Sequence, residues 1–301
     1  MGNSQSLQTI FETPYLPYLG FGLGARFDLT KFDSNYLQTK LQVNTTFLGK
    51  KGLQWKVSVE SDNTSLLNAD TNGIRATFNF PVINANRRTA YGLALSYQSW
   101  DYIFNPSRGF AFDARGTAGL KRIVKDVRIE RIVFEDGVGN SYTLYDSLEL
   151  DFIQYQAGFS LEYIFPVFKN KWVIYNQIES QSNWAPQLFF NDLYRLGGFS
   201  SLRGFDEQSI FAARYLSSTI ELRYRIDNFS NFFLFINGLI YETEIENYTG
   251  PSSDIPYGFG LGANINTQNT TLQMAYAYGQ QQGNQINLRQ GKFHFGLVNY
   301  F

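Results

Sequence analysis

The longest regular feature of this sequence is an alternation of apolar residues with polar or small residues that continues for ten residues or more. Residues 17–29, 89–99, 256–266 and 270–280 all follow it, with large apolar side chains recurring at every second position. A period of two predicts β-strands that have one apolar face. Strands of soluble proteins typically have about five or six residues, whereas membrane barrels use segments of about ten. We therefore expect strands that cross a membrane.

The composition agrees with strands that have two unlike faces. Only 17% of the 301 residues are charged, 17% are aromatic, and the mean hydropathy is -0.25. Soluble domains carry about 25% charged residues. The longest strictly apolar run, 232–236, is far below the roughly 18 residues that a membrane-spanning helix needs. A lipid-facing apolar side and a polar inner side cancel in the mean hydropathy, and alternation between them leaves no long apolar run.

Several other classes of protein are disfavoured. The chain has no cysteine, which excludes disulfide scaffolds, thiol catalysis and Cys-based zinc sites. A net charge of -1 gives no electrostatic basis for binding nucleic acid. We interpret the single histidine, His294, as an ordinary side chain that faces the lumen, and no acidic residues have metal-site spacing. We expect no enzyme, no catalytic residue, no metal and no cofactor.

The predicted fold is all-β, a transmembrane antiparallel β-barrel of about 14 strands. Single-chain bacterial barrels have even strand numbers, so 12 and 16 are the alternatives. The whole chain, 1–301, is expected to form one barrel domain. Residues 4–12 alternate poorly, but they are needed to complete fourteen. The other predicted strands are 17–29, 36–47, 52–61, 71–80, 89–99, 108–134, 141–165, 171–182, 211–226, 231–243, 256–266, 270–280 and 291–301.

Two segments predict which strand ends face outward. Strands 108–134 and 141–165 are too long to lie wholly in a bilayer, so we expect a projecting hairpin with its tip at 136–140. The segment 183–210 is the longest loop. Because bacterial barrels have short periplasmic turns and longer external loops, both features are placed outside the cell, in the outer membrane of a Gram-negative bacterium. The first residues show no secretory signal, so we expect that signal to have been removed.

The long loop and the strand after it carry the most informative motif. Gly197 and Gly198 permit a tight turn with positive φ, and Gly204 permits close backbone packing beside Arg203. Charges in a low-dielectric wall need partners, so we expect the loop to enter the lumen and Arg203 to join charges there. The charged residues that share the inward phase of the next strand are Glu221, Arg223 and Arg225.

These residues resemble the hallmark of the BamA/TamA/FhaC superfamily of outer-membrane assembly and translocation barrels. In that family the motif lies at the tip of the sixth external loop, which folds back into the barrel, and five strands follow it, as predicted here. Residues 105–110 also resemble the family's periplasmic Pro-x-x-Gly turn. The resemblance covers roughly 100–301 and more weakly the rest. The loop motif that it implies is Gly197, Gly198, Leu202, Arg203, Gly204 and Phe205.

The sequence departs from the family at two points. Where the resemblance implies an Asp partner for the loop arginine, this chain has Asn237. Arg203 is therefore expected to pair with Glu221 or to form a neutral hydrogen bond with Asn237. The family also carries POTRA domains before the barrel, and the predicted strands leave no room for them here. Either they were cut away or this is a barrel-only member. The expected lumen partners of the motif are Glu221, Arg223, Arg225 and Asn237.

The resemblance implies a non-enzymatic function, the insertion, assembly or translocation of proteins at the outer membrane. A weak seam between the first and last strands would offer an edge to a client strand. The implied partners are the lipid bilayer with its lipopolysaccharide, and client outer-membrane proteins or periplasmic factors. A passive pore and a scaffold for a separately encoded partner are the alternatives. The predicted C-terminal assembly signal consists of Phe293, Phe295, Leu297 and Phe301.

Overall fold

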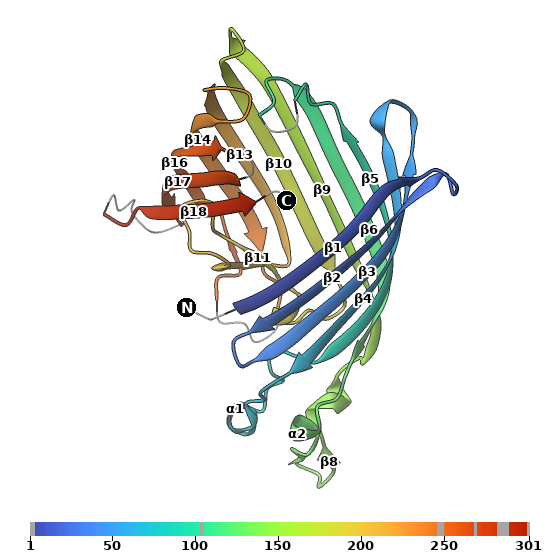
Figure 1. Ribbon diagram of the computed structural model, residues 1–301. Coiled ribbons are helices and arrows are strands. Elements are labelled where there is room, and N and C mark those ends of the chain that lie inside the picture. Colours follow the sequence, from blue (N-terminus) through green and yellow to red (C-terminus); the bar gives the residue numbers. More distant parts are fainter. Residues whose placement is uncertain (1–3, 103–104, 246–249, 268–269, 282–288, 300–301) are drawn as a thin grey trace.

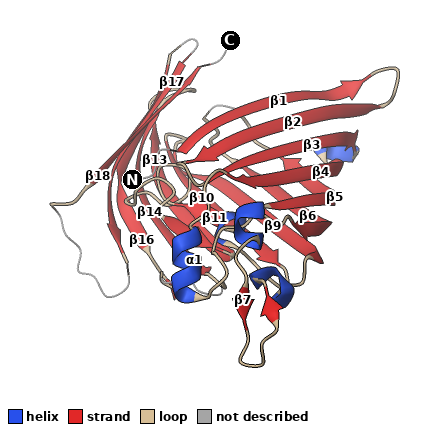
Figure 2. Ribbon diagram, turned by 90° about the horizontal axis from the view of Figure 1, so that it is seen from below, coloured by secondary structure: helices blue, strands red, loops and turns tan. Residues whose placement is uncertain are grey.

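One large antiparallel sheet dominates the computed structural model, which describes residues 4–102, 105–245, 250–267, 270–281 and 289–299. The sheet curls around a concave side, with the first and last strands at its two edges (Figures 1 and 2). Within the described residues these two edge strands do not pair with each other. In order across the sheet, the strands are β1 (Ser4–Leu16), β2 (Phe21–Phe32), β3 (Tyr36–Leu48), β4 (Gln54–Leu66), β5 (Asn86–Gln98), β6 (Gly109–Ile123), β9 (Asp151–Phe168), β10 (Trp172–Trp184), β13 (Arg214–Arg225), β14 (Asn231–Glu242), β16 (Tyr257–Asn266), β17 (Thr270–Gln280) and β18 (Lys292–Asn299).

Most strands separate an apolar outer face from an inner face of polar or small residues. In β5, Tyr91 and Leu93 are 70% and 67% exposed, whereas on the other face Ala90 is fully buried and Arg88 is nearly so. A strand of 13 residues is about 43 Å long, and at a tilt of about 45° it spans roughly 30 Å. That length matches the hydrocarbon core of a bilayer. Among the described residues, no helix is long and apolar enough to cross a membrane.

The strand predictions are right for most segments, wrong for 71–80, and too long for the two strands of the projecting hairpin. Residues 4–12 do form an edge strand, β1, in register with β2. Residues 71–80 instead contain the helix α1 (Thr71–Thr77), because Asp70 accepts a hydrogen bond from the N–H of Gly73 at 2.9 Å and caps the first turn. The described sheet therefore has thirteen long strands, and its fourteenth is the two-residue β15 (Ser253–Asp254), which pairs with β14.

The predicted long hairpin projects from the sheet, but helices interrupt its strands. After β6 the chain forms α2 (Val127–Glu130), the short strands β7 (Phe134–Glu135) and β8 (Ser141–Tyr142), and the 3-10 helix η2 (Leu144–Ser147). Residues 67–85 and 124–150, the helical cap, protrude together at one end of the sheet (Figure 1). The cap has an apolar core that continues into the sheet: Ile74, Ile123, Ile129, Ile132, Phe134, Leu144, Tyr145, Phe152 and Phe189.

Asp126 and Arg128 join two parts of the cap. Arg128 donates to the carboxylate of Asp126, and this hydrogen bond lowers the pKa of that carboxyl below its ordinary value. The same guanidinium donates to the carbonyl oxygens of Leu66 and Leu67 at 3.1 Å each. The α2 segment is thereby attached to the end of β4, and the cap behaves as one packed unit.

Short turns join the strands at the opposite end of the sheet. Asn105, from the turn that resembles the family motif, is buried and donates to the carbonyl oxygens of Asp227 and Ser230 at 2.9 and 3.1 Å. It also accepts from the side chain of Asn231 at 3.0 Å. Because these partners belong to the β13–β14 turn, Asn105 connects two turns that are not neighbours in the sheet.

Candidate functional site: the loop motif on the inner wall

The long loop between β10 and β13 lies against the concave face of the sheet. We call residues 183–210 the inner loop. After the end of β10 it contains the 3-10 helix η3 (Phe190–Asp192) and β11 (Tyr194–Leu196), which pairs with β12 (Ile210–Ala212). This short ladder presents the segment between β11 and β12 as a compact lobe directed at the inner wall of β13–β18.

The two glycines of the motif form the turn that the sequence predicted. Gly197 and Gly198 have φ values of +108° and +92°, a region that glycine adopts without steric cost. The N–H of Gly197 donates to the hydroxyl of Ser201 at 2.8 Å, and the N–H of Phe199 donates to the carboxylate of Glu207 at 2.8 Å. The turn is therefore held by side chains of the loop itself.

Arg203 and Glu221 form an ion pair on the inner wall. The Nη1 of Arg203 lies 2.6 Å from Oε1 of Glu221, and the Nε of Arg223 lies 2.7 Å from the other carboxylate oxygen. The side chain of Glu221 is only 1% exposed. A buried carboxylate requires such compensation, because an unpaired charge in this surrounding costs several kcal/mol. The structure thus places Arg203 against the charged partner named from the sequence.

Aromatic rings enclose both guanidinium groups of this cluster. The guanidinium carbon of Arg203 lies 5.1 Å from the ring centres of Phe199 and Phe233 and 4.6 Å from that of Phe235. Arg223 stacks on Tyr175 at 3.8 Å. Cation–π contacts in a desolvated setting strengthen the attraction of an arginine to its site. The rings therefore fix the orientation of the guanidinium groups, and Glu221 balances their charge.

Asn237 contacts the backbone of the loop arginine. With its amide oxygen turned toward the loop, Asn237 accepts from the N–H of Arg203 at 2.7 Å and donates to the carbonyl of Gly258 at 2.8 Å. A neutral amide can satisfy both groups at once, since it carries a donor and an acceptor. Both expected partners of Arg203 thus contact it, Glu221 at the side chain and Asn237 at the main chain.

Arg225 is not part of this cluster, contrary to the prediction. It lies four residues beyond Glu221, which is about 13 Å along a strand. Its Nη1 donates to the carbonyl of Asn170 at 3.0 Å, in the β9–β10 turn. The inward phase was therefore assigned correctly, but the distance along β13 separates Arg225 from the loop motif.

The remaining motif residues pack or approach the wall closely. Leu202 is fully buried in an apolar cluster, with Phe205 packed against it. Gly204 has a φ of +97°, and a Cβ there would lie 2.6 Å from the carbonyl oxygen of Tyr278. Contact of this kind between loop and wall backbone requires glycine.

Two residues of the last strand were missed as members of the site. The N–H of Gly204 donates to Nε2 of His294 at 3.1 Å, and the ammonium of Lys292 lies 2.6 Å from the carboxylate of Asp206. The alternation of β18 predicted that His294 faces the lumen, but the partner lies 90 residues away in the sequence. No local pattern could have identified that contact.

The first half of the inner loop is attached to the opposite wall. The ammonium of Lys121 on β6 lies 2.5 Å from the carboxylate of Asp192, and both side chains are buried. The side-chain amide of Asn191 accepts from the backbone N–H of Asn84 and donates to its carbonyl, both at 3.1 Å. The inner loop is therefore bound to two different parts of the sheet.

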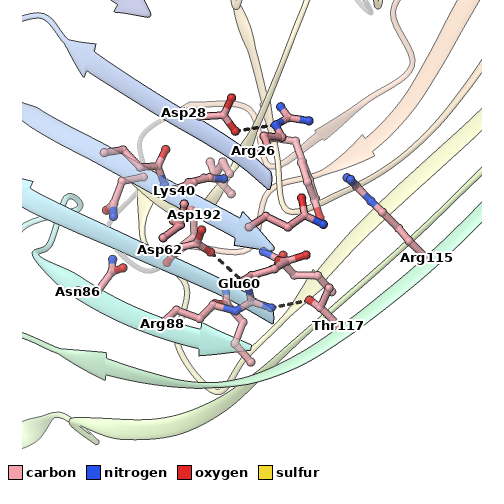
Figure 3. Close-up of a pocket in the computed structure, with 18 of the residues that line it drawn as sticks. Arg26, Asp28, Lys40, Glu60, Asp62, Asn86, Arg88, Arg115, Thr117 and Asp192 are labelled. Atoms are coloured by element: carbon pink, nitrogen blue, oxygen red, sulfur yellow. Dashed lines mark hydrogen bonds and ion pairs between the residues drawn. The ribbon is translucent and has the colours of Figure 1, made fainter. Parts of the chain in front are cut away.

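A polar cavity of about 230 Å³ lies beneath this attachment, and Asn191, Asp192 and Tyr194 form part of its lining. Figure 3 shows Arg88 directed at Asp62 and Thr117, with distances of 3.2 and 2.5 Å. Equal numbers of opposite charges give the cavity no strong preference for either sign of ion. The charged lining residues are Arg26, Lys40, Arg88 and Arg115, and Asp28, Glu60, Asp62 and Asp192.

The predicted C-terminal signal is described in part. Phe293, Phe295 and Leu297 are 65%, 60% and 54% exposed and share the outer face of β18. Phe301 lies outside the described residues. Apolar side chains on the outer face of an edge strand suit contact with lipid.

Comparison with known proteins gives one family and a shared fold. The model of the Omp85 superfamily domain matches residues 3–301. The crystal structure of BamA from Haemophilus ducreyi lacking POTRA domains 1-3 is 14% identical, with a TM-score of 0.67, over 99% of this chain and 62% of that chain. CdiB from Acinetobacter baumannii is 12% identical, with a TM-score of 0.48, over 98% of this chain and 59% of that chain. No curated protein sequence matches.

The family match spans nearly the whole chain and confirms the resemblance drawn from the loop motif. The similarity to the BamA structure extends it to the fold, although this chain spans only about three fifths of that structure's length. The curled antiparallel sheet, its apolar outer face and the motif on its inner wall agree with that match. The chain belongs to the Omp85 superfamily, whose barrels sit in the outer membrane.

Proposed function

We propose that this chain acts in the insertion, assembly or translocation of proteins at the outer membrane of a Gram-negative bacterium, where it forms a transmembrane barrel. One observation carries the proposal. The Arg203–Glu221 pair fixes the inner loop to the wall that ends in β18, and the same loop contacts β18 through Gly204. The loop motif and a strand edge thus form one continuous structure.

The edge strands supply the chemistry of the proposed function. In the described sheet, β18 pairs with β17 and β1 pairs with β2, so each has a second side that no described strand covers. Unpaired backbone N–H and C=O groups of an edge recruit a further strand. A client outer-membrane protein whose strands are still unpaired gains hydrogen bonds by adding to such an edge. We propose that β1 and β18 form the seam of the barrel and that clients enter there.

This mechanism uses no catalytic residue. The buried pair contributes by holding the loop in one position, because its charges are satisfied only when Arg203 contacts Glu221. The outer face of β18, with Phe293 and Phe295, keeps the edge in lipid while the inner face carries His294 against the loop. The proposed partners are therefore the lipid bilayer with its lipopolysaccharide, unfolded client barrels, and the periplasmic factors that deliver them.

The test measures client folding by liposomes that contain this protein. An unfolded outer-membrane barrel in urea is diluted into them, and its folding is followed by the shift of the folded band on unheated gels. We expect wild-type protein to accelerate folding over empty liposomes. Glu221→Gln should reduce the acceleration at least about tenfold, because breaking a buried pair costs about 3–5 kcal/mol.

Arg122→Ala is the matched control, because Arg122 forms an exposed pair with Asp151 at 2.6 Å and does not touch the inner loop. It should retain wild-type acceleration. Arg203→Lys keeps a positive charge opposite Glu221 but loses the forked guanidinium that fixes the loop. It therefore distinguishes a displaced loop from a protein that fails to fold. If liposomes that contain the wild-type protein fold the client no faster than empty liposomes, the proposal is refuted.

The polar cavity beneath the inner loop favours one second candidate, a passive pore. A pore would conduct steadily in planar bilayers and leave client folding unchanged. The inner loop crosses above the cavity and is held there by the Lys121–Asp192 pair. We therefore expect small or no steady conductance from the wild-type protein, and a large one would favour the pore.

A further inference from the structure

We infer that the inner loop is a strut that sets the distance between the two edge strands of the sheet. The inference rests on the proposed function, because that distance matters where the edges admit a client strand. Its basis is that the loop is anchored close to both edges at once. The positioning residues are Arg195 at one end of the strut and Lys292 with His294 at the other.

Arg195 anchors the loop near the N-terminal edge. Its guanidinium carbon lies 3.9 Å from the ring centre of Phe32 on β2, and its Nη2 donates to the hydroxyl of Tyr36 on β3 at 2.5 Å. The rings of Phe190 in the inner loop and Phe211 on β12 have their centres within 5.6 Å of the same group. A planar guanidinium with aromatic rings around it and a hydroxyl acceptor has little freedom to move.

Three contacts anchor the loop at the other edge. Gly204 donates its N–H to His294, and Asp206 receives the ammonium of Lys292. Both partners lie on the inner face of β18, and the ring of Phe199 packs beside that of His294 with centres 6.5 Å apart. Acceptance at Nε2 requires a neutral imidazole whose proton is on Nδ1. The last strand is thus attached to the loop by three different kinds of interaction.

The loop between these anchors is stiff. Residues 194–196 pair in register with 210–212, and the N–H of Gly198 donates to the carbonyl of Leu202 at 3.1 Å. Leu202 is fully buried, and the Arg203–Glu221 pair fixes the middle of the lobe to β13. Arg195 and Gly204 are only nine residues apart, and a strand ladder and a buried side chain hold the segment between them. The distance between the two anchors can therefore change little. A displacement of β18 is therefore transmitted to β2 and β3.

The rival explanation is that the twist of the sheet alone fixes its edges. The two explanations differ in what happens when one anchor is removed. If the twist is sufficient, removal of Arg195 leaves the edges in place. If the loop is the strut, that removal lets both edges move although Arg195 touches neither β1 nor β18 in any contact described above.

The test measures the distance between the edges directly. The chain has no cysteine, so Leu7→Cys on β1 and Phe295→Cys on β18 give two unique spin-label sites, both on the exposed outer face. Pulsed electron resonance on the full chain in liposomes should give one narrow distance distribution. With Arg195→Ala or Lys292→Ala, we expect the distribution to become about twofold broader, since a released segment samples more conformations.

Three controls keep the result decisive. Arg122→Ala removes an exposed ion pair with Asp151, formed without the inner loop, and should leave the distribution unchanged. His294→Gln keeps an acceptor for the N–H of Gly204 and should stay narrower than His294→Ala. Folded protein is recognised by its shifted band on unheated gels, so a variant that does not fold is not scored.

The outcomes separate the strut from the proposed function. Unchanged distributions in Arg195→Ala and Lys292→Ala would overturn the strut, whatever the client assay gives. Broader distributions with wild-type rates of client folding would overturn the claim that edge spacing controls client access. Wild-type protein that folds no client, while both variants still broaden, would refute the proposed function and leave the strut supported.

Discussion

The buried pair between Lys121 and Asp192 gives the sharpest prediction about stability. Lys121 is fully buried beside Phe152 and Phe189, with ring centres 5.8 and 5.6 Å from its ammonium. Lys121→Met keeps a similar volume but leaves the carboxylate of Asp192 without its cation. Removing one partner of a buried pair typically costs about 3–5 kcal/mol, a large share of the roughly 5–15 kcal/mol that stabilises a folded domain.

A double-mutant cycle isolates the interaction from the rest. Asp192→Asn alone should cost a similar amount, because Lys121 is then the unpaired charge. The double variant should lose much less than the sum, since no charge remains buried and an amide oxygen can still accept from the N–H of Phe189. Urea unfolding in micelles, followed by the fluorescence of the four tryptophans, gives the free energies. Additive losses, or single losses below about 1 kcal/mol, would refute a buried ion pair.

Three further predictions concern topology, the outer face and the loop contact. Val138→Cys, 87% exposed at the tip of the projecting hairpin, should react with a membrane-impermeant maleimide on intact cells, whereas Asn170→Cys in a turn at the other end should react only after lysis. Leu93→Lys should destabilise folding into bilayers by about 2–4 kcal/mol, measured against Leu93→Ile, and an equal midpoint would contradict a lipid-facing position. Gly204→Ala should lower the free energy of unfolding by about 1–3 kcal/mol and expose the inner loop to protease. An unchanged cleavage pattern would argue against close packing of Gly204 on the wall.

Alternation predicted the sheet well because it reflects a physical division between lipid and lumen. The inward and outward phases of β5 and β18 were read correctly from residues two apart. The error at 71–80 has a different origin. That segment lies outside the sheet, where neither face is constrained by lipid, and the capping contact of Asp70 decides its conformation.

The candidate site was predictable only where a motif was known. The resemblance singled out Arg203, and the phase of β13 made Glu221 one of its two expected partners beside Asn237. Lys121 has the same inward phase as Arg115, but nothing local indicates that Asp192 should meet it. His294 is the same case, because its partner comes from a loop whose course the sequence does not specify. Contacts between a wall and a loop depend on the three-dimensional path of the loop.

The position of His294 also has a consequence for the order of folding. The seat of Gly204 includes backbone of β17 and the imidazole of β18, which is the last strand of the chain. The surroundings of Gly204 are therefore incomplete until β18 has paired with β17. Contacts between residues so distant in sequence form slowly, since the intervening chain must first be ordered. The contacts of Gly204 and Asp206 with β18 thus form only after β18 has paired, and a chain without β18 would keep the Arg203–Glu221 pair but lose these two contacts.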